Sequence, residues 1–202
     1  GKYENRLKIG GVKITIDGSP QGRTAFFTTP YLTGGPGGEK DWRGELTFPQ
    51  ATVDQMVKRV YDLGVPLNLH ANVANRGAEQ AMYVSPMRDA IDAGLRPTNH
   101  TDFVVAPIDQ MFMLWSAVNR LSRAGAAIGP DQRVTPIEGL RAMTIDVARQ
   151  YGEEKTKGSL EAGKLADLVI LDGNPLEVDP MAIREIAVVE TIKEGETIYR
   201  AH

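Results

Sequence analysis

Alternation between apolar and polar residues predicts two strands early in the chain. Between residues 12 and 17 every second residue is apolar, which places Lys13, Thr15 and Asp17 together on the opposite face of a strand. Residues 65–70 alternate in the same way over a shorter stretch. Each predicted strand therefore has one apolar face for packing and one polar face that is available for chemistry.

Apolar residues spaced three and four apart predict helices between and after these strands. The predicted helices cover residues 47–63, 85–94, 110–123 and 135–151. Two of them open with a capping box, Thr47 with Gln50 and Thr135 with Glu138. A polar strand end is predicted at residues 97–102. Because strands alternate with helices, we expect this part of the chain to form a parallel α/β arrangement.

The pattern changes after Gly152, where short strands replace helices. Strands are predicted at residues 166–171, 183–191 and 196–199, with a turn at Glu194-Gly195 before the last of them. We therefore divide the chain into an α/β part, residues 1–151, and a small β-rich part, residues 152–202.

Composition narrows the class of protein. The chain has 202 residues, of which 42% are apolar and 24% are charged, as in soluble globular proteins. A net charge of −3 excludes a broad basic surface for nucleic acid, and no apolar run approaches the ~18 residues that span a bilayer. Cysteine is absent, so a metal site would have to use the histidines (His70, His100 and His202), carboxylates or a less common ligand.

Residues capable of metal binding or proton transfer fall on the polar faces of the predicted strands. Lys13 lies within the first strand, whereas His70 and the pair His100 and Asp102 lie at or near the carboxyl ends of later strands. In a parallel barrel, inward strand residues line the interior and active sites form at the carboxyl ends. Each residue also has a purely structural interpretation: a solvated lysine, a hydrogen-bonded core histidine, and an aspartate that caps a turn.

Four segments of the chain carry a family resemblance. They are Val12–Ser19 continued by Gly22–Ala25, His70-Ala71-Asn72, Thr98–Asp102, and Lys157–Asp172. These segments resemble the amidohydrolase superfamily, and most closely its amidohydrolase family 3 branch, which includes N-substituted formamide deformylases. The resemblance extends over nearly the whole chain. It implies an α/β fold made of part of a (β/α)8 TIM-type barrel and a C-terminal segment of a small β-sandwich.

The same resemblance implies a metal-dependent hydrolase of non-peptide C–N bonds in small amides, formamides or cyclic amides. Lys13, carboxylated on its amine, would bridge the metal ions, and His70 and Asp102 would be further ligands. Asp102 would also act as general base and acid while a metal-activated hydroxide attacks the substrate. Arg23 and His100 would contact the small-molecule substrate. The cofactor would be one or two divalent ions, with zinc expected among the several that such ligands accept.

Several features of the family are absent from this sequence. A complete barrel takes ~250 residues, whereas residues 1–151 supply only three candidate barrel strands. This sequence lacks the paired histidines of the family's first strand and the histidine of the family's sixth strand. The residues that follow Asn72 resemble a much later part of the family sequence. We therefore expect missing segments near Asn72-Val73 and before Gly1, so that the true N-terminus is not part of this sequence.

Three interpretations stay open at this point. The chain is a partial view of a hydrolase, a non-catalytic remnant or binding scaffold of the same fold, or one piece of a cleaved or multi-chain hydrolase. Subunits of the family commonly pair, which leaves a homodimer open. A cytoplasmic location is favoured, although the sequence does not fix the compartment.

Overall fold

The computed structural model describes residues 3–5, 7–20, 22–27, 29–70, 85–103 and 106–201, and for His70 the backbone alone. The chain divides into two compact units, residues 1–81 and residues 82–202, and each is described by itself. The domain boundary predicted at residue 151 falls inside the second unit and stays a prediction. The predicted junction at Asn72-Val73 lies outside the described residues.

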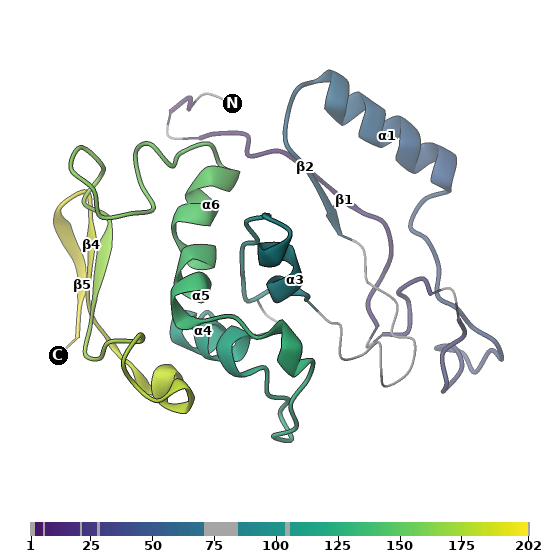
Figure 1. Ribbon diagram of the computed structural model, residues 1–202. Helices are drawn as coiled ribbons and strands as arrows, with labels where there is room; N and C mark the ends of the chain where they lie inside the picture. The colour runs from purple at the N-terminus through teal and green to yellow at the C-terminus, as the bar shows by residue number, and fades with distance from the viewer. Residues whose placement is uncertain are drawn as a thin grey trace. The chain divides into compact units, whose positions relative to one another are not determined.

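The first unit is built around a parallel pair of strands connected by a helix (Figure 1). Strand β1 (Val12–Thr15) pairs in parallel with β2 (Leu67–His70), and α1 (Gln50–Asp62) connects them. Ile14 of β1 and Val60 of α1 are each 5% exposed, and both line the same cleft. The buried Ile14 lies between the exposed Lys13 and Thr15, as the alternation of the sequence predicts.

The start of α1 differs from the prediction. The helix begins at Gln50 with Pro49 at the N-cap and no capping side chain, so the predicted capping box of Thr47 and Gln50 is wrong. The reason is that the backbone N–H of Thr47 donates to the carbonyl oxygen of Ile16 at 2.8 Å, which keeps Thr47 in the extended segment beside the end of β1. Gly64, with a φ of 63°, follows the helix at its carboxyl end, where glycine is common because it adopts this conformation without strain.

The second unit contains helices followed by an antiparallel sheet (Figure 1). Its elements are α3 (Met87–Asp92), α4 (Gln110–Asn119), the 3-10 helix η1 (Pro130–Gln132), α5 (Pro136–Met143), α6 (Ile145–Gln150), β3 (Leu168–Leu171), the 3-10 helix η2 (Pro180–Glu185), β4 (Val188–Lys193) and β5 (Glu196–Arg200). The three strands lie in the order β3-β4-β5. The main core is formed where α4 packs on η2, around the fully buried Leu114 and Ile183.

The single helix predicted at 135–151 is two helices, α5 and α6, in the structure (Figure 1). The capping box of Thr135 and Glu138 is confirmed at the start of α5. The chain breaks at Thr144, which has φ −127° and ψ −92°. The hydroxyl of Thr144 donates to the carbonyl oxygen of Leu140 at 2.8 Å, and such a bond to the residue four positions earlier competes with regular helix geometry.

The strand predicted at 183–191 starts later than expected. Pro180 begins η2, which extends to Glu185, and β4 begins only at Val188. Proline suits the first turn of a helix because its missing N–H has no intrahelical partner there. The predicted turn at Glu194-Gly195 is confirmed, with φ values of 52° and 87° as a tight hairpin turn requires.

The polar segment 97–102 is not a strand in the structure. It is held by α5 and α6 instead. The backbone N–H of Asn99 donates to the carbonyl oxygen of Ala142 at 3.1 Å, and the hydroxyl of Thr98 donates to Gln150 Oε1 at 3.0 Å. The backbone bonds of this segment are therefore made partly to helices rather than to a neighbouring strand.

The described residues form a mixed α/β structure, and none of its strands belongs to a closed barrel. No described helix combines the length and apolar character needed to cross a membrane.

One ion pair connects α3 to the start of α5. The guanidinium of Arg88 donates to both carboxylate oxygens of Glu138, at 2.9 and 2.8 Å. This bond, more than those from Thr135, lowers the pKa of Glu138 from 4.5 to about 2. A carboxylate whose pKa is depressed by folding stabilises the folded state above its ordinary pKa, and this contribution is lost as the pH falls toward its folded pKa.

Glu138→Gln is therefore expected to lower the free energy of unfolding at pH 7. The pKa shift sets a ceiling of roughly 3 kcal/mol, and partial exposure of the pair reduces the expected loss to about 1–2 kcal/mol. The difference between the two proteins should shrink as the pH falls from 4.5 toward 2, because Glu138 becomes protonated in the wild type. Urea unfolding at pH 7 and pH 3 measures both effects. The exposed Glu177→Gln serves as the control, and equal losses in both variants would contradict the assignment.

Candidate metal centre and catalytic residues

The polar face of the β1–β2 pair brings two predicted site positions onto neighbouring strands. Lys13 lies opposite Asn68, and Thr15 lies opposite His70. Because side chains alternate along each strand, Lys13, Thr15, Asn68 and the position of His70 share one face. His70 is the last residue of β2, at the carboxyl end where the predicted site lies.

Lys13 has an amine without a partner in the described part of the chain. It is exposed, and it makes no hydrogen bond or ion pair with any residue that the structure describes. The amine is chemically available, and its carboxylation stays a prediction.

The loop after β1 positions Asp17 and Arg23 mainly for structural roles. The Asp17 carboxylate is 3% exposed and accepts a hydrogen bond from the Phe26 N–H at 3.0 Å. It fixes the loop against the end of the strand. Arg23 Nη1 lies 3.4 Å from the carbonyl oxygens of Thr33 and Gly34. This guanidinium nitrogen binds the loop that contains Thr33 and Gly34, and the substrate contact of Arg23 stays a prediction.

His100 and Asp102 form a local pair in the second unit. The backbone N–H of Asp102 donates to His100 Nδ1 at 3.0 Å, so Nδ1 is an acceptor and Nε2 is left as the donor of a neutral ring. Asp102 has a φ of 50°, which is uncommon outside glycine, asparagine and aspartate. Both side chains are exposed. The Asp102 carboxylate accepts no hydrogen bond from the described residues and is open to a ligand.

The predicted ligands belong to different units. Lys13 and His70 lie in the first unit and Asp102 lies in the second, so their convergence stays a prediction. Among the described residues, no group of three or more histidine, cysteine, aspartate or glutamate side chains could hold a metal ion. A carboxylated lysine is not among these residue types. The predicted set of metal ligands, Lys13, His70 and Asp102, therefore depends on carboxylation of Lys13.

Three arginines that the sequence pattern did not single out line one pocket of the second unit. They are Arg96, Arg141 and Arg149. The last two are eight residues apart within the helical pattern predicted at 135–151, which puts them close to the same side of a helix. This spacing is the feature of the sequence that could have indicated a cluster of arginines.

In comparisons with known proteins, residues 73–199 match the family model described as "Amidohydrolase family". The chain is 34% identical over 152 residues to N-substituted formamide deformylase of Arthrobacter pascens, which covers 70% of this chain and 28% of that protein. It is 20% identical over 166 residues to the putative amidohydrolase YtcJ of Bacillus subtilis (strain 168), covering 76% and 31%. The chain thus spans about a third of the length of these curated relatives.

Solved structures show the same fold over most of the chain. An uncharacterized metal-dependent hydrolase from Pyrococcus horikoshii OT3 has a TM-score of 0.73 at 22% identity, covering 89% of this chain and 48% of that chain. Another, from Pyrococcus furiosus, has a TM-score of 0.66 at 23% identity, covering 88% and 47%. The described architecture is therefore about half of a fold that occurs in larger proteins.

Proposed function

Because the chain belongs to the amidohydrolase family, we propose that it is part of a metal-dependent hydrolase of non-peptide C–N bonds. The proposed substrates are small amides, formamides or cyclic amides, as the name of the formamide deformylase relative suggests. In this proposal β1 and β2 are two strands of a (β/α)8 barrel, and β3, β4 and β5 are part of a small β-sandwich. The match to residues 73–199 is the observation that carries the proposal.

A divalent cation, proposed to be zinc, would be held by Lys13 after carboxylation, by His70 and by Asp102. The donor chemistry fits: the amine of Lys13 has no competing carboxylate among the described residues, and β1 and β2 place Lys13 and the position of His70 on one face. Carboxylation joins the lysine nitrogen to carbon dioxide with loss of a proton, which gives two oxygen ligands. When bound, a divalent cation lowers the pKa of coordinated water and polarises a substrate carbonyl.

The protein's own groups would manage the protons of the reaction. Asp102 would take a proton from the attacking water and return it to the departing amine, which leaves poorly as an anion. Its carboxylate is free for this because no described residue donates to it. His100 would present Nε2–H to the substrate, since Nδ1 is occupied by the Asp102 N–H. Arg23 would bind substrate with the guanidinium nitrogens that do not contact the loop carbonyls.

A non-catalytic binding scaffold of the same fold is the second candidate. The exposure of Lys13 favours it, as does the finding that no three histidine or acidic side chains of the described residues could hold a metal ion together. Under this alternative the family relationship persists without the chemistry.

Metal uptake is the first test of the proposed function. Wild-type protein loaded with zinc and then desalted should retain the metal, and added bicarbonate should increase the amount, because carboxylation supplies ligands. Lys13→Ala should weaken zinc binding by at least about tenfold and abolish the bicarbonate effect. The control is Lys193→Ala, which removes an exposed lysine from the end of another strand. Elemental analysis measures the zinc content of each protein, and intact mass confirms the identity of each variant. Equal retention in the two variants, or no retention in the wild type, would favour the scaffold.

A further inference from the structure

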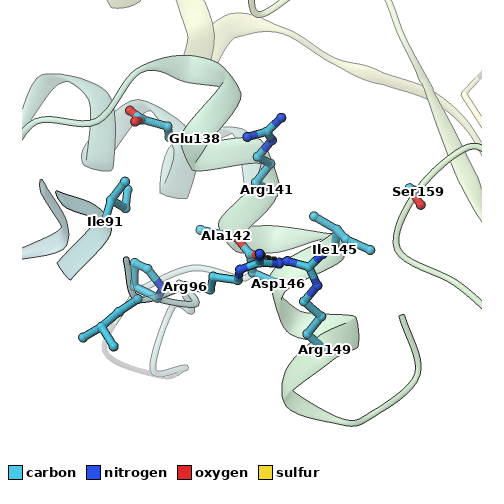
Figure 2. Close-up of a pocket in the computed structure, with 11 residues that line it drawn as sticks. Ile91, Arg96, Glu138, Arg141, Ala142, Ile145, Asp146, Arg149 and Ser159 are labelled. Carbon is cyan, nitrogen blue, oxygen red and sulfur yellow. Dashed lines mark ion pairs between the residues drawn. The ribbon is translucent and has the colours of Figure 1, made fainter. Parts of the chain in front are cut away.

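A pocket of about 490 Å³ lies on the second unit, between α3, the segment that follows it, and α5 with α6 (Figure 2). The charged residues of its lining are Arg96, Glu138, Arg141, Asp146 and Arg149. Arg96 precedes the segment that ends in Asp102, so it lies at the opposite end of that segment from the proposed catalytic carboxylate. The volume is within the range of small-molecule sites.

Three guanidinium groups dominate the polar part of this pocket. Arg96 comes from the segment after α3, Arg141 from α5 and Arg149 from α6. Figure 2 shows Arg96 and Arg149 extending in this view from opposite sides toward Asp146, while Arg141 stands on the side of Glu138. The cations therefore approach the pocket from three separate elements of the unit.

The positive charge of the pocket is largely uncompensated. Asp146 meets Arg149 only at 3.7 Å, and Glu138 is engaged by both terminal nitrogens of Arg88. Arg96 and Arg141 make no hydrogen bond or ion pair with the residues that the structure describes. Arg88 also pairs with Asp92, at 3.0 Å from its Nε. Arg96 and Arg141 thus remain as two guanidinium groups of the lining that no described carboxylate pairs with.

The backbone that carries these arginines is held in place without them. The N–H of Asn99 donates to the carbonyl oxygen of Ala142, and Thr98 bonds Gln150, which together fasten the segment of Arg96 to α5 and α6. The capping box of Thr135 fixes the start of α5. Because the scaffold is preorganised, the arginines are not needed to hold it together and are free to bind a ligand.

We propose that this pocket binds a small organic molecule that carries a dianionic phosphate group. The forked geometry of guanidinium matches phosphate oxygens, and a dianion suits two guanidinium groups, Arg96 and Arg141, that have no partner among the described residues. Ile91, Leu95 and Ile145 add apolar walls that suit an organic body attached to the phosphate. The residues of this pocket are different from the proposed metal ligands, and the proposal does not depend on those ligands.

Isothermal titration calorimetry on the full chain tests this proposal with three probes: phenyl phosphate, inorganic phosphate and the monoanion benzoate. Phenyl phosphate should bind most tightly, because it alone combines the dianion with an apolar body. Arg141→Gln and Arg96→Gln should each weaken it by roughly tenfold, and Arg141→Lys by less, since charge is kept but the fork is lost. Arg123→Gln, an exposed arginine outside the pocket, should change nothing.

Several outcomes would overturn the site. Binding that weakens equally in Arg123→Gln and Arg141→Gln would reflect surface charge alone. Inorganic phosphate binding as tightly as phenyl phosphate would identify an ion site without an organic ligand, and absence of binding by all probes would remove the pocket from consideration. Circular dichroism of each variant confirms that the fold is retained, as expected for Arg96 and Arg141, which have no intramolecular partner among the described residues.

Discussion

Replacing Asp102 by asparagine is expected to lower kcat for hydrolysis of an N-substituted formamide by about 10²–10⁴-fold, the usual contribution of a general acid–base group. Asparagine has nearly the same shape and tolerates the φ of 50° at this position, so the backbone should not change. It cannot accept the proton of the attacking water or return one to the departing amine. The prediction depends on the proposed function.

Asp41→Asn is the matched control for this substitution. Asp41 is also an exposed aspartate with positive φ, at 58°, and lies in a loop of the first unit. Steady-state kinetics on zinc-loaded protein, with the zinc content of each sample measured, separates lost proton transfer from lost metal. A reduced kcat at full zinc content supports the role of Asp102 as general base. An unchanged kcat in Asp102→Asn would assign proton transfer to another group.

The sequence predicts local features of the fold well because they depend on neighbouring residues. The polar face that Lys13 shares with Thr15 follows from a period of two, and the structure confirms β1 where the alternation predicts it. The capping box at Thr135 is likewise a property of four consecutive residues. These features need no knowledge of distant parts of the chain.

Features that depend on distant partners were predicted less well. Thr47 has the right residue type for an N-cap, but its N–H bonds the carbonyl of Ile16, thirty-one residues earlier. The segment 97–102 has the composition of a strand end, yet Asn99 bonds the carbonyl of Ala142 on a helix. In both cases a long-range hydrogen bond decides the conformation, and no local pattern contains it.

The candidate site has the same division between local and distant information. The resemblance supplies Lys13, His70 and Asp102 as candidates, and the parallel register then puts Lys13 and the position of His70 on one face. The meeting of that face with Asp102 requires the two units to assemble, which depends on contacts between residues far apart in sequence. The pocket of arginines was missed for a related reason, since Arg96 joins Arg141 only through the fold.

Leu114→Ala is expected to destabilise the second unit strongly. Leu114 is 0% exposed and lies in the cluster formed by α4 and η2. Truncating a buried leucine removes its burial energy and leaves a cavity, which together cost about 3–5 kcal/mol. Urea unfolding followed by tryptophan fluorescence measures the loss, because Trp115 belongs to the same cluster. The exposed Leu160→Ala should cost little by comparison.

Gly139 of α5 provides a sharper test of the same packing. A Cβ atom added there would lie 2.4 Å from Leu114 Cδ1, so Gly139→Ala alone should destabilise the protein. Overpacking of this kind costs about 1–3 kcal/mol, whereas the higher helix propensity of alanine stabilises the protein by only about 1 kcal/mol. In the Leu114→Ala background the obstructing atom is gone. Gly139→Ala should then stabilise the protein by about 1 kcal/mol, since it fills part of the cavity and favours the helix. The same sign of effect in both backgrounds would show that α4 and α5 do not meet at these two residues.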